Sequence, residues 1–214
     1  MNCHPYDGKD GMKVWLDEQE VRLFLDQAKN TTQEIAFSLG VRSGLRVHEI
    51  VNVRAKDVVT TTAGPRVRVQ EGKGDKYRET VATANLYRTA RVLVDPGGYD
   101  PDDQLVQNAI RTVRQWVYDA AETLAAQTGD ENWRHLGPHD LRRTWATQMV
   151  GKYKVDPLLV CDYGGWEDLK TFLEHYRGIY SPEVQRRELS KVDWLDIEES
   201  TTETRAPETV LLEG

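Results

Sequence analysis

The chain has 214 residues, 39% hydrophobic and 29% charged, with a formal net charge of −7. This length suffices for one globular domain with its own core. No apolar stretch is long enough to span a membrane, and the polar N-terminus lacks the apolar segment of a secretory signal. The two cysteines, Cys3 and Cys161, exclude a disulfide scaffold and a cysteine-rich zinc module, and they predict a cytoplasmic location.

The negative charge is concentrated at one end of the chain. Residues 192–214 hold seven acidic residues and one arginine, and so carry six of the seven net negative charges. The rest of the chain is therefore close to neutral and can present a basic face to a nucleic acid. We expect residues 200–214 to form an acidic flexible tail.

The first third of the chain predicts helices. Residues 1–13 have no periodicity and are expected to be disordered. A helix is predicted after Asp17, where the sequence DEQE has the form of a capping box. A second helix is predicted over 31–41, ending near Gly44, and a short third helix over 47–53.

The period then changes from helical to alternating. Residues 58–59 lead into a turn, and Val67 and Val69 alternate with polar residues as in a half-buried strand. The sequence GKGD at 72–75 is typical of a hairpin turn, and 76–83 is predicted to be the return strand. A small antiparallel sheet is therefore expected within an otherwise helical chain.

The remainder again has helical spacing. Helices are predicted over 84–94, 104–127, 138–150, 157–163 and 169–176, and a last one opens at Ser181. The expected fold class is α+β and mainly α-helical: a helical bundle with a small three-stranded antiparallel sheet. We expect a single domain over 14–199.

Two early segments contain residues suited to binding an anion. In SGLRVHEI, a glycine ends one helix and Arg46 opens the next, which places a guanidinium beside helix N-terminal amides. In GKGDKYR, Lys73 lies at a hairpin tip from which it can reach a ligand. A glycine cap with a surface arginine, and a solvated lysine, are the ordinary structural explanations.

Two later segments add further polar groups. In HDLRRT, His139 and Arg142 are three residues apart near a helix start, so they share a face and can bind one oxyanion together. In GGW and TFLEHY, Trp166 offers an indole N–H and Tyr176 a phenol. Each of these aromatic residues could equally be part of the core.

In this order the four segments resemble the boxes of the tyrosine recombinase (phage integrase) family. SGLRVHEI is similar to the first arginine box, GKGDKYRETV to the lysine hairpin, GPHDLRRTWAT to the H-x-x-R box, and YGGWEDLKTFLEHY to the segment with the nucleophilic tyrosine. The resemblance covers residues 15 to 190. It matches the catalytic domain of the family and not its N-terminal clamp domain.

The resemblance implies phosphoryl transfer on double-stranded DNA without a metal, ATP or another cofactor. Tyr176 would attack the scissile phosphate to form a 3′-phosphotyrosyl bond and release a 5′-hydroxyl. Tyr180 is the second candidate, because Tyr176 lies one residue further from Trp166 than is usual in the family. The resemblance also implies a homo-oligomer on DNA, a tetramer.

The family's other roles are carried over to matching positions. Arg46 and Arg142 would bind the non-bridging oxygens, and Lys73 would protonate the leaving oxygen. His139 would donate to the phosphate or assist proton transfer, and Trp166 would donate a hydrogen bond. Glu49 would orient Arg46 or His139. The candidates for contacts with DNA phosphates are Arg42, Arg66, Arg68, Arg78, Arg143, Lys152 and Lys154.

Two other functions fit the same motifs. A DNA-binding or regulatory module could keep the fold without the chemistry, and a type IB topoisomerase-like enzyme could relax DNA without recombining it. The apolar residues of 192–197 and 210–212 could dock on a partner subunit or pack within the chain.

Overall fold

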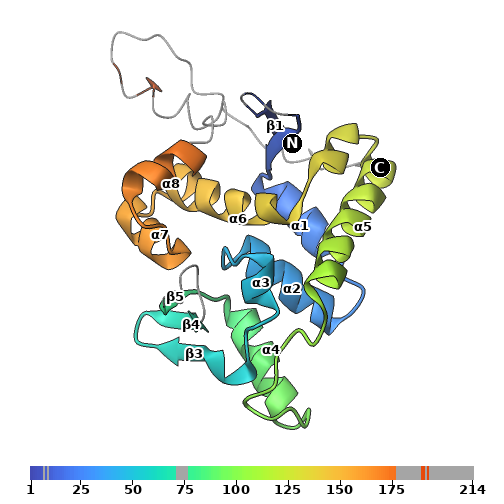
Figure 1. The fold of residues 1–214 in the computed structure, drawn as a ribbon, viewed down its shortest axis with the longest axis vertical. Helices are drawn as coiled ribbons and strands as arrows, with labels where there is room; N and C mark the ends of the chain where they lie inside the picture. Colours follow the sequence, from blue (N-terminus) through green and yellow to red (C-terminus); the bar gives the residue numbers. More distant parts are fainter. Residues whose placement is uncertain (7, 9, 71–76, 177–188, 191, 193–214) are drawn as a thin grey trace, which may run out of the picture. The chain divides into compact units, whose positions relative to one another are not determined.

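The computed structural model describes residues 1–6, 8, 10–70, 77–176, 189, 190 and 192, and for 174–176 it describes the backbone alone. The chain divides into two compact units, Met1–Gly178 and Ile179–Gly214. The named helices and strands lie in the first unit (Figure 1). The expected tail at 200–214 and the helix expected from Ser181 lie outside the described residues.

The N-terminal helices pack on a long one. Helices α1 (Glu18–Leu25), α2 (Thr31–Val41) and α5 (Ile110–Thr128) share a core that includes Phe24 and Phe37, whose ring centroids are 4.6 Å apart. Asp17 and Glu20 exchange backbone-to-side-chain hydrogen bonds, which confirms the predicted capping box. The 3-10 turn Glu131–His135 follows α5 and buries Trp133 in the same core.

The first residues form a hairpin, so the expectation of disorder over 1–13 was wrong. Strands β1 (Asn2–Pro5) and β2 (Met12–Trp15) pair antiparallel. The backbone N–H of Val14 donates to Asp140 Oδ1 (3.2 Å), and that of Leu16 to Thr144 Oγ1 (3.0 Å). These hydrogen bonds attach β2 and the residue after it to helix α6, more than a hundred residues away, and local sequence does not reveal such a contact.

The predicted three-stranded sheet is confirmed. Strands β3 (Val58–Thr61), β4 (Gly64–Val69) and β5 (Arg78–Val81) are antiparallel in that order. Val67 and Val69 are buried and Arg68 between them is exposed, as the alternation predicts. Helix α4 (Ala84–Val94) matches its predicted bounds and packs beside β3 and β4. The predicted turn at 72–75 lies outside the described residues.

The segment before α5 is irregular and not helical, which corrects the predicted start at 104. The backbone N–H of Leu105 donates to the carbonyl of Val53 (2.9 Å), and Gln104 forms an isolated bridge with Arg54. Leu105 and Val106 are fully buried. These two apolar side chains belong to the same core as Ala55, in the short 3-10 turn Ala55–Asp57, and they do not form the face of a helix.

The last helices surround a separate cluster of aromatic residues. Helix α6 (Pro138–Thr147) passes into a π-helical turn, Gln148–Lys152, and is followed by α7 (Pro157–Gly164) and α8 (Leu169–Tyr176). Trp145, Val160, Cys161 and Phe172 are buried together there. Helix α6 runs between the α7–α8 pair and the N-terminal helices (Figure 1). None of the helices in the described part of the chain is long and apolar enough to cross a membrane.

Candidate active site

Arg46 lies at the turn between two helices and is held by Glu49. Gly44 has a left-handed φ of 70°, which redirects the chain from α2 into the short helix α3 (Val47–Ile50). Arg46 donates its backbone N–H to Glu49 Oε2 (2.7 Å) and its Nη1 to Oε1 (3.0 Å). This amide is therefore already used by an internal carboxylate, and an arriving anion would meet the guanidinium rather than this helix N-terminus. Arg46 is one of the two side chains that Glu49 is expected to orient.

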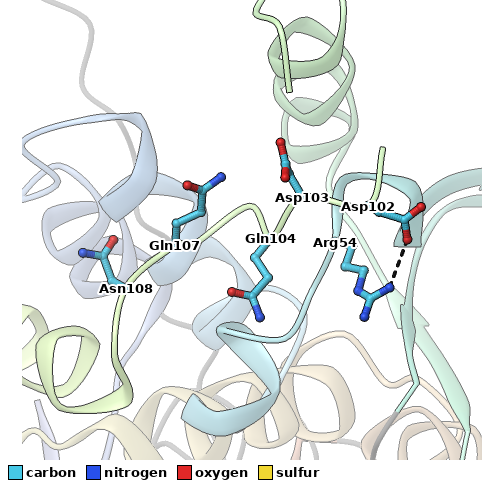
Figure 2. A pocket seen from close by; sticks show the side chains of 6 residues that line it. All are labelled: Arg54, Asp102, Asp103, Gln104, Gln107 and Asn108. Atoms are coloured by element: carbon cyan, nitrogen blue, oxygen red, sulfur yellow. Dashed lines mark hydrogen bonds and ion pairs between the residues drawn. The ribbon is translucent and has the colours of Figure 1, made fainter. Parts of the chain in front are cut away.

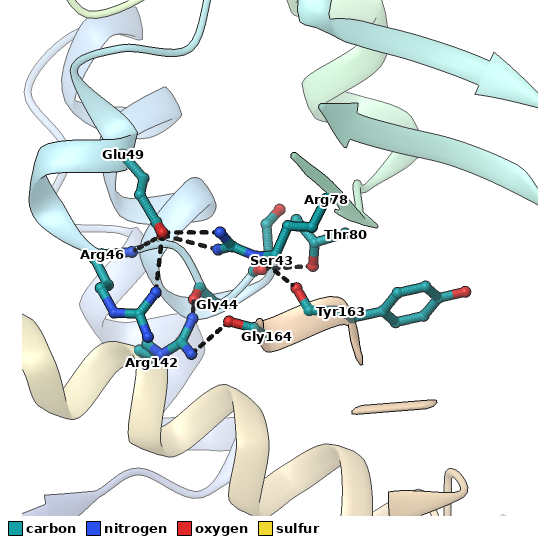
Figure 3. Close-up of polar contacts among 9 residues, drawn as sticks. All are labelled: Ser43, Gly44, Arg46, Glu49, Arg78, Thr80, Arg142, Tyr163 and Gly164. Carbon is teal, nitrogen blue, oxygen red and sulfur yellow. Dashed lines mark hydrogen bonds and ion pairs between the residues drawn. The ribbon is translucent and has the colours of Figure 1, made fainter. Parts of the chain in front are cut away.

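Glu49 is fully buried and binds a second arginine. Arg78 donates Nη1 to Oε1 (2.8 Å) and Nη2 to Oε2 (2.9 Å), a bidentate pair (Figure 3). Burial alone would raise the pKa of Glu49, but the bonds and charges of Arg78 and Arg46 outweigh it and lower the pKa to about 2. The carboxylate is therefore ionised at neutral pH.

Arg142 reaches the same place from α6. Its side chain is fully buried, and it donates Nη1 to the carbonyl of Gly44 (2.6 Å) and Nη2 to that of Gly164 (2.7 Å). Figure 3 shows its guanidinium beside that of Arg46.

Two tryptophans cover the two glycines that accept from Arg142. A Cβ on Gly44 would lie 2.3 Å from the Trp145 ring, and one on Gly164 would lie 1.7 Å from the Trp166 ring. The two indoles stack at 6.2 Å, and the Arg142 guanidinium carbon lies 3.9 Å from the Trp166 ring centroid. Trp166, expected to be a hydrogen-bond donor, has its ring face packed against Arg142.

The remaining expected catalytic residues are placed less completely. His139 is exposed near the start of α6, three residues before the buried Arg142. Tyr176 is the last residue of α8, and only its backbone is described. Lys73 and Tyr180 lie outside the described residues, so the choice between the two tyrosines stays a prediction.

Two of the arginines expected to contact DNA are instead buried. Arg143 is 6% exposed, forms an ion pair with Asp140 and donates Nη2 to the hydroxyl of Tyr6 (3.1 Å). Burial raises the pKa of Asp140, against the opposing charge of Arg143. The Arg78 side chain is 8% exposed and binds Glu49. Neither side chain faces solvent, and both have internal partners.

The other five candidates are at least partly exposed. Arg42 binds Glu18, and its hydrogen bonds are the main cause that lowers the pKa of Glu18 to about 2. Arg66 is half-buried and donates to the hydroxyl of Tyr163 (3.2 Å). Arg68 pairs with Glu79 on the neighbouring strand. Lys152 and Lys154 are exposed.

The sequence reasoning missed the structural roles of Arg78, Gly164 and Trp145. Residues 78 and 80 share one face of a strand, but only the structure shows that Thr80 is buried and that this face is internal. For Gly164 and Trp145 there was no local signal, since their partners come from other helices.

A separate open pocket of about 540 Å³ contains none of the expected site residues (Figure 2). Arg54 donates to Asp102 there (3.0 Å). The other lining residues are Asp103, Gln104, Gln107 and Asn108. Among the residues described, no three His, Cys, Asp or Glu side chains are grouped so as to hold a metal ion.

The buried carboxylate of Glu49 predicts a loss of stability in acid. Its pKa is lowered from 4.5 to about 2, so its contribution is fully present above pH 4.5 and is lost as the pH falls toward 2. At 1.36 kcal/mol per pKa unit, up to about 3 kcal/mol of the free energy of unfolding should depend on this ionisation.

The measurement is thermal unfolding as a function of pH for the parent and Glu49→Gln. The variant should be less stable at pH 7, because Arg46 and Arg78 lose their counter-charge, and its stability should fall less between pH 4.5 and 2. Glu122→Gln, a change at an exposed carboxylate, is the control and should follow the parent. An equal fall in stability between pH 4.5 and 2 for Glu49→Gln and the parent would contradict the lowered pKa of Glu49.

Part of this chain is similar in sequence to a known protein. A tyrosine recombinase from Pseudothermotoga lettingae is 30% identical over 143 residues, which is 67% of this chain and 48% of that protein. The chain thus spans about half the length of this curated relative.

Solved structures show the same fold at lower identity. The XerA recombinase superposes with a TM-score of 0.65 at 21% identity, covering 83% of this chain and 64% of the other. A XerH recombinase bound to its difH substrate superposes with a TM-score of 0.61 at 22% identity, covering 85% of this chain and 53% of the other. The catalytic domain of bacteriophage HP1 integrase gives 0.54 at 13% identity, covering 84% and 95%. The model of the phage integrase family matches residues 14–181, most of the sequence, and the chain belongs to that family.

Proposed function

We propose that this chain is the catalytic domain of a site-specific recombinase that cleaves and rejoins double-stranded DNA through a 3′-phosphotyrosyl intermediate. The observation that carries the proposal is the bond from Arg142 to the carbonyl of Gly44, 98 residues away in sequence. It brings the second arginine to the turn that holds the first. Such convergence of two guanidiniums beside an ionised, buried Glu49 suits a phosphodiester.

The two arginines would act on the charge that develops during transfer. In the transition state, negative charge is concentrated on the non-bridging oxygens of the phosphate, and preorganised donors stabilise it without further rearrangement. Glu49 holds Arg46 in place, and the carbonyls of Gly44 and Gly164 hold Arg142.

Tyr176 would be the nucleophile. Residues four apart in a helix share a face, so position 176 belongs to the face of α8 that carries Phe172. Phe172 is buried and packs against Trp166 with ring centroids 4.8 Å apart. The new phosphotyrosine stores the energy of the broken phosphodiester, so that the released 5′-hydroxyl of another strand can reverse the step. Lys73 would protonate the leaving oxygen, and His139 would assist at the phosphate.

DNA as the partner is supported by relatives and by exposed basic residues. The XerH recombinase and the Tn1549 transposon integrase have been solved in complex with DNA. Arg68, Lys152 and Lys154 are exposed in this chain. Assembly into a tetramer on DNA rests on the family resemblance.

The test is covalent capture from a library of nicked duplexes with randomised sequences. A nick beside the cleavage site lets the short leaving strand diffuse away, so the phosphotyrosyl adduct accumulates and survives denaturing electrophoresis. We expect such an adduct, with the DNA joined to protein at its 3′ end. DNA binding without any adduct would overturn the proposal in favour of a silent DNA-binding module. Relaxation of supercoiled DNA without joining of two captured duplexes would favour a topoisomerase.

A further inference from the structure

Arg78 uses its guanidinium entirely inside the protein. Two of its nitrogens donate to the two oxygens of Glu49, and Nε donates to the backbone carbonyl of Tyr163 (3.0 Å). The side chain is 8% exposed. A residue so occupied is not available to a DNA phosphate, and its three bonds join two segments far apart in sequence.

Each of these segments holds one of the two arginines of the site. Glu49 binds Arg46 through both the backbone N–H and the guanidinium. Tyr163 directly precedes Gly164, whose carbonyl accepts from Arg142. The Arg78 guanidinium therefore lies between the support of Arg46 and the support of Arg142 (Figure 3).

The surroundings of Arg78 leave it little freedom. Gly165 has a left-handed φ of 67°, and a Cβ there would lie 2.8 Å from Arg78 Cδ, so the side chain passes directly over this glycine. Two residues further along β5, the buried Thr80 donates to the carbonyl of Ser43 (2.8 Å), in the turn that leads to Arg46. The strand is thus attached to the same turn at a second point.

We propose that Arg78 is a positioning residue for DNA cleavage, which sets the distance between Arg46 and Arg142 by tying Glu49 to the end of α7. This inference rests on the proposed function. The planar fork of arginine is required, because the point charge of a lysine cannot bind both carboxylate oxygens and a carbonyl in fixed directions. A displacement of about 1 Å in a positioning group can cost about 10²-fold in rate.

The test is Arg78→Lys, measured by single-turnover adduct formation at saturating DNA and separately by DNA affinity. We expect the saturating rate to fall about 10²-fold, in line with a small displacement of the arginines, while the affinity stays within about threefold of the parent. Arg88→Lys, the same change at an exposed position of α4, is the control and should keep the parent's saturating rate. A weaker affinity with an unchanged saturating rate would overturn the proposal, since that is the behaviour of a direct phosphate contact.

A double-mutant cycle separates positioning from a general loss of stability. Because Arg78 acts through Glu49, the double variant Arg78→Lys/Glu49→Gln should lose much less rate than the product of the two single fold-reductions. Full additivity would overturn the proposal. If Arg78→Lys does not fold, Gly165→Ala serves instead, because its methyl group displaces Arg78 without removing it. It should show the same slow rate at unchanged affinity, and a rate equal to the parent's would overturn the proposal.

Adduct formation by the parent protein separates a failure of the proposed function from a failure of the role of Arg78. If the parent forms no adduct with any duplex in the library, both the proposed function and the role of Arg78 are wrong. If the parent forms the adduct and Arg78→Lys does so at the same rate, the recombinase proposal stands and only the role of Arg78 fails.

Discussion

Tyr176→Phe is expected to abolish the covalent protein–DNA adduct while leaving DNA binding intact. The change removes one phenolic oxygen, the atom that would form the bond to phosphorus. Loss of the nucleophile in other covalent catalysts costs on the order of 10⁶-fold in rate, so the adduct should fall below detection. The measurement is denaturing electrophoresis of the captured nicked duplex, with affinity determined in parallel.

Tyr180→Phe is the matched control for this prediction. It makes the same chemical change four residues further along and should leave adduct formation at the parent's level. The reverse pattern, an adduct in Tyr176→Phe and none in Tyr180→Phe, would transfer the nucleophilic role to Tyr180. Adducts in both variants would show that neither phenol is required by itself and would contradict the assignment to Tyr176.

Arg142→Lys is expected to slow adduct formation by roughly 10²–10³-fold, the usual cost of removing one oxyanion donor. A lysine can keep the charge but cannot donate to Gly44, Gly164 and a phosphate at once. The same change leaves buried carbonyl groups without their donors, at about 1–3 kcal/mol for each unsatisfied group, so the melting temperature should also fall. Single-turnover rates should therefore be compared at a temperature below the thermal unfolding transition of the variant.

The control for Arg142→Lys is the same change at the next residue. Arg143 lies on the same helix, is also buried and binds Asp140 instead of the site. Arg143→Lys should lower the melting temperature while the folded fraction cleaves at nearly the parent's rate. Equal loss of rate in the two variants would mean that α6 contributes through its stability alone, and the role given to Arg142 would be wrong.

Recognition of the site from sequence depended on the order of four short motifs. The arginine box and the H-x-x-R box identified Arg46, Glu49 and Arg142, which the structure brings together. The count of basic residues was a poor guide to DNA contacts, because an arginine's formal charge does not tell whether its partner is a phosphate or an internal carboxylate. Arg78 and Arg143 both have internal partners, Glu49 and Asp140.

Local sequence determined much of the secondary structure of this protein. The helices over 31–41, 84–94 and 169–176 have the bounds that caps and periodicity predicted, and Val67 and Val69 are buried as the alternation predicted. Caps and periodicity act over a few residues, so they can be evaluated without knowing the fold.

Only the tertiary structure decided the N-terminal hairpin, the irregular segment before α5 and the support of the two arginines. Val14 bonds to Asp140 across 126 positions, Arg78 to Tyr163 across 85, and Arg142 to Gly44 across 98. In each case the free energy comes from burying a polar group together with a distant partner, and no short stretch of sequence contains both members of the pair.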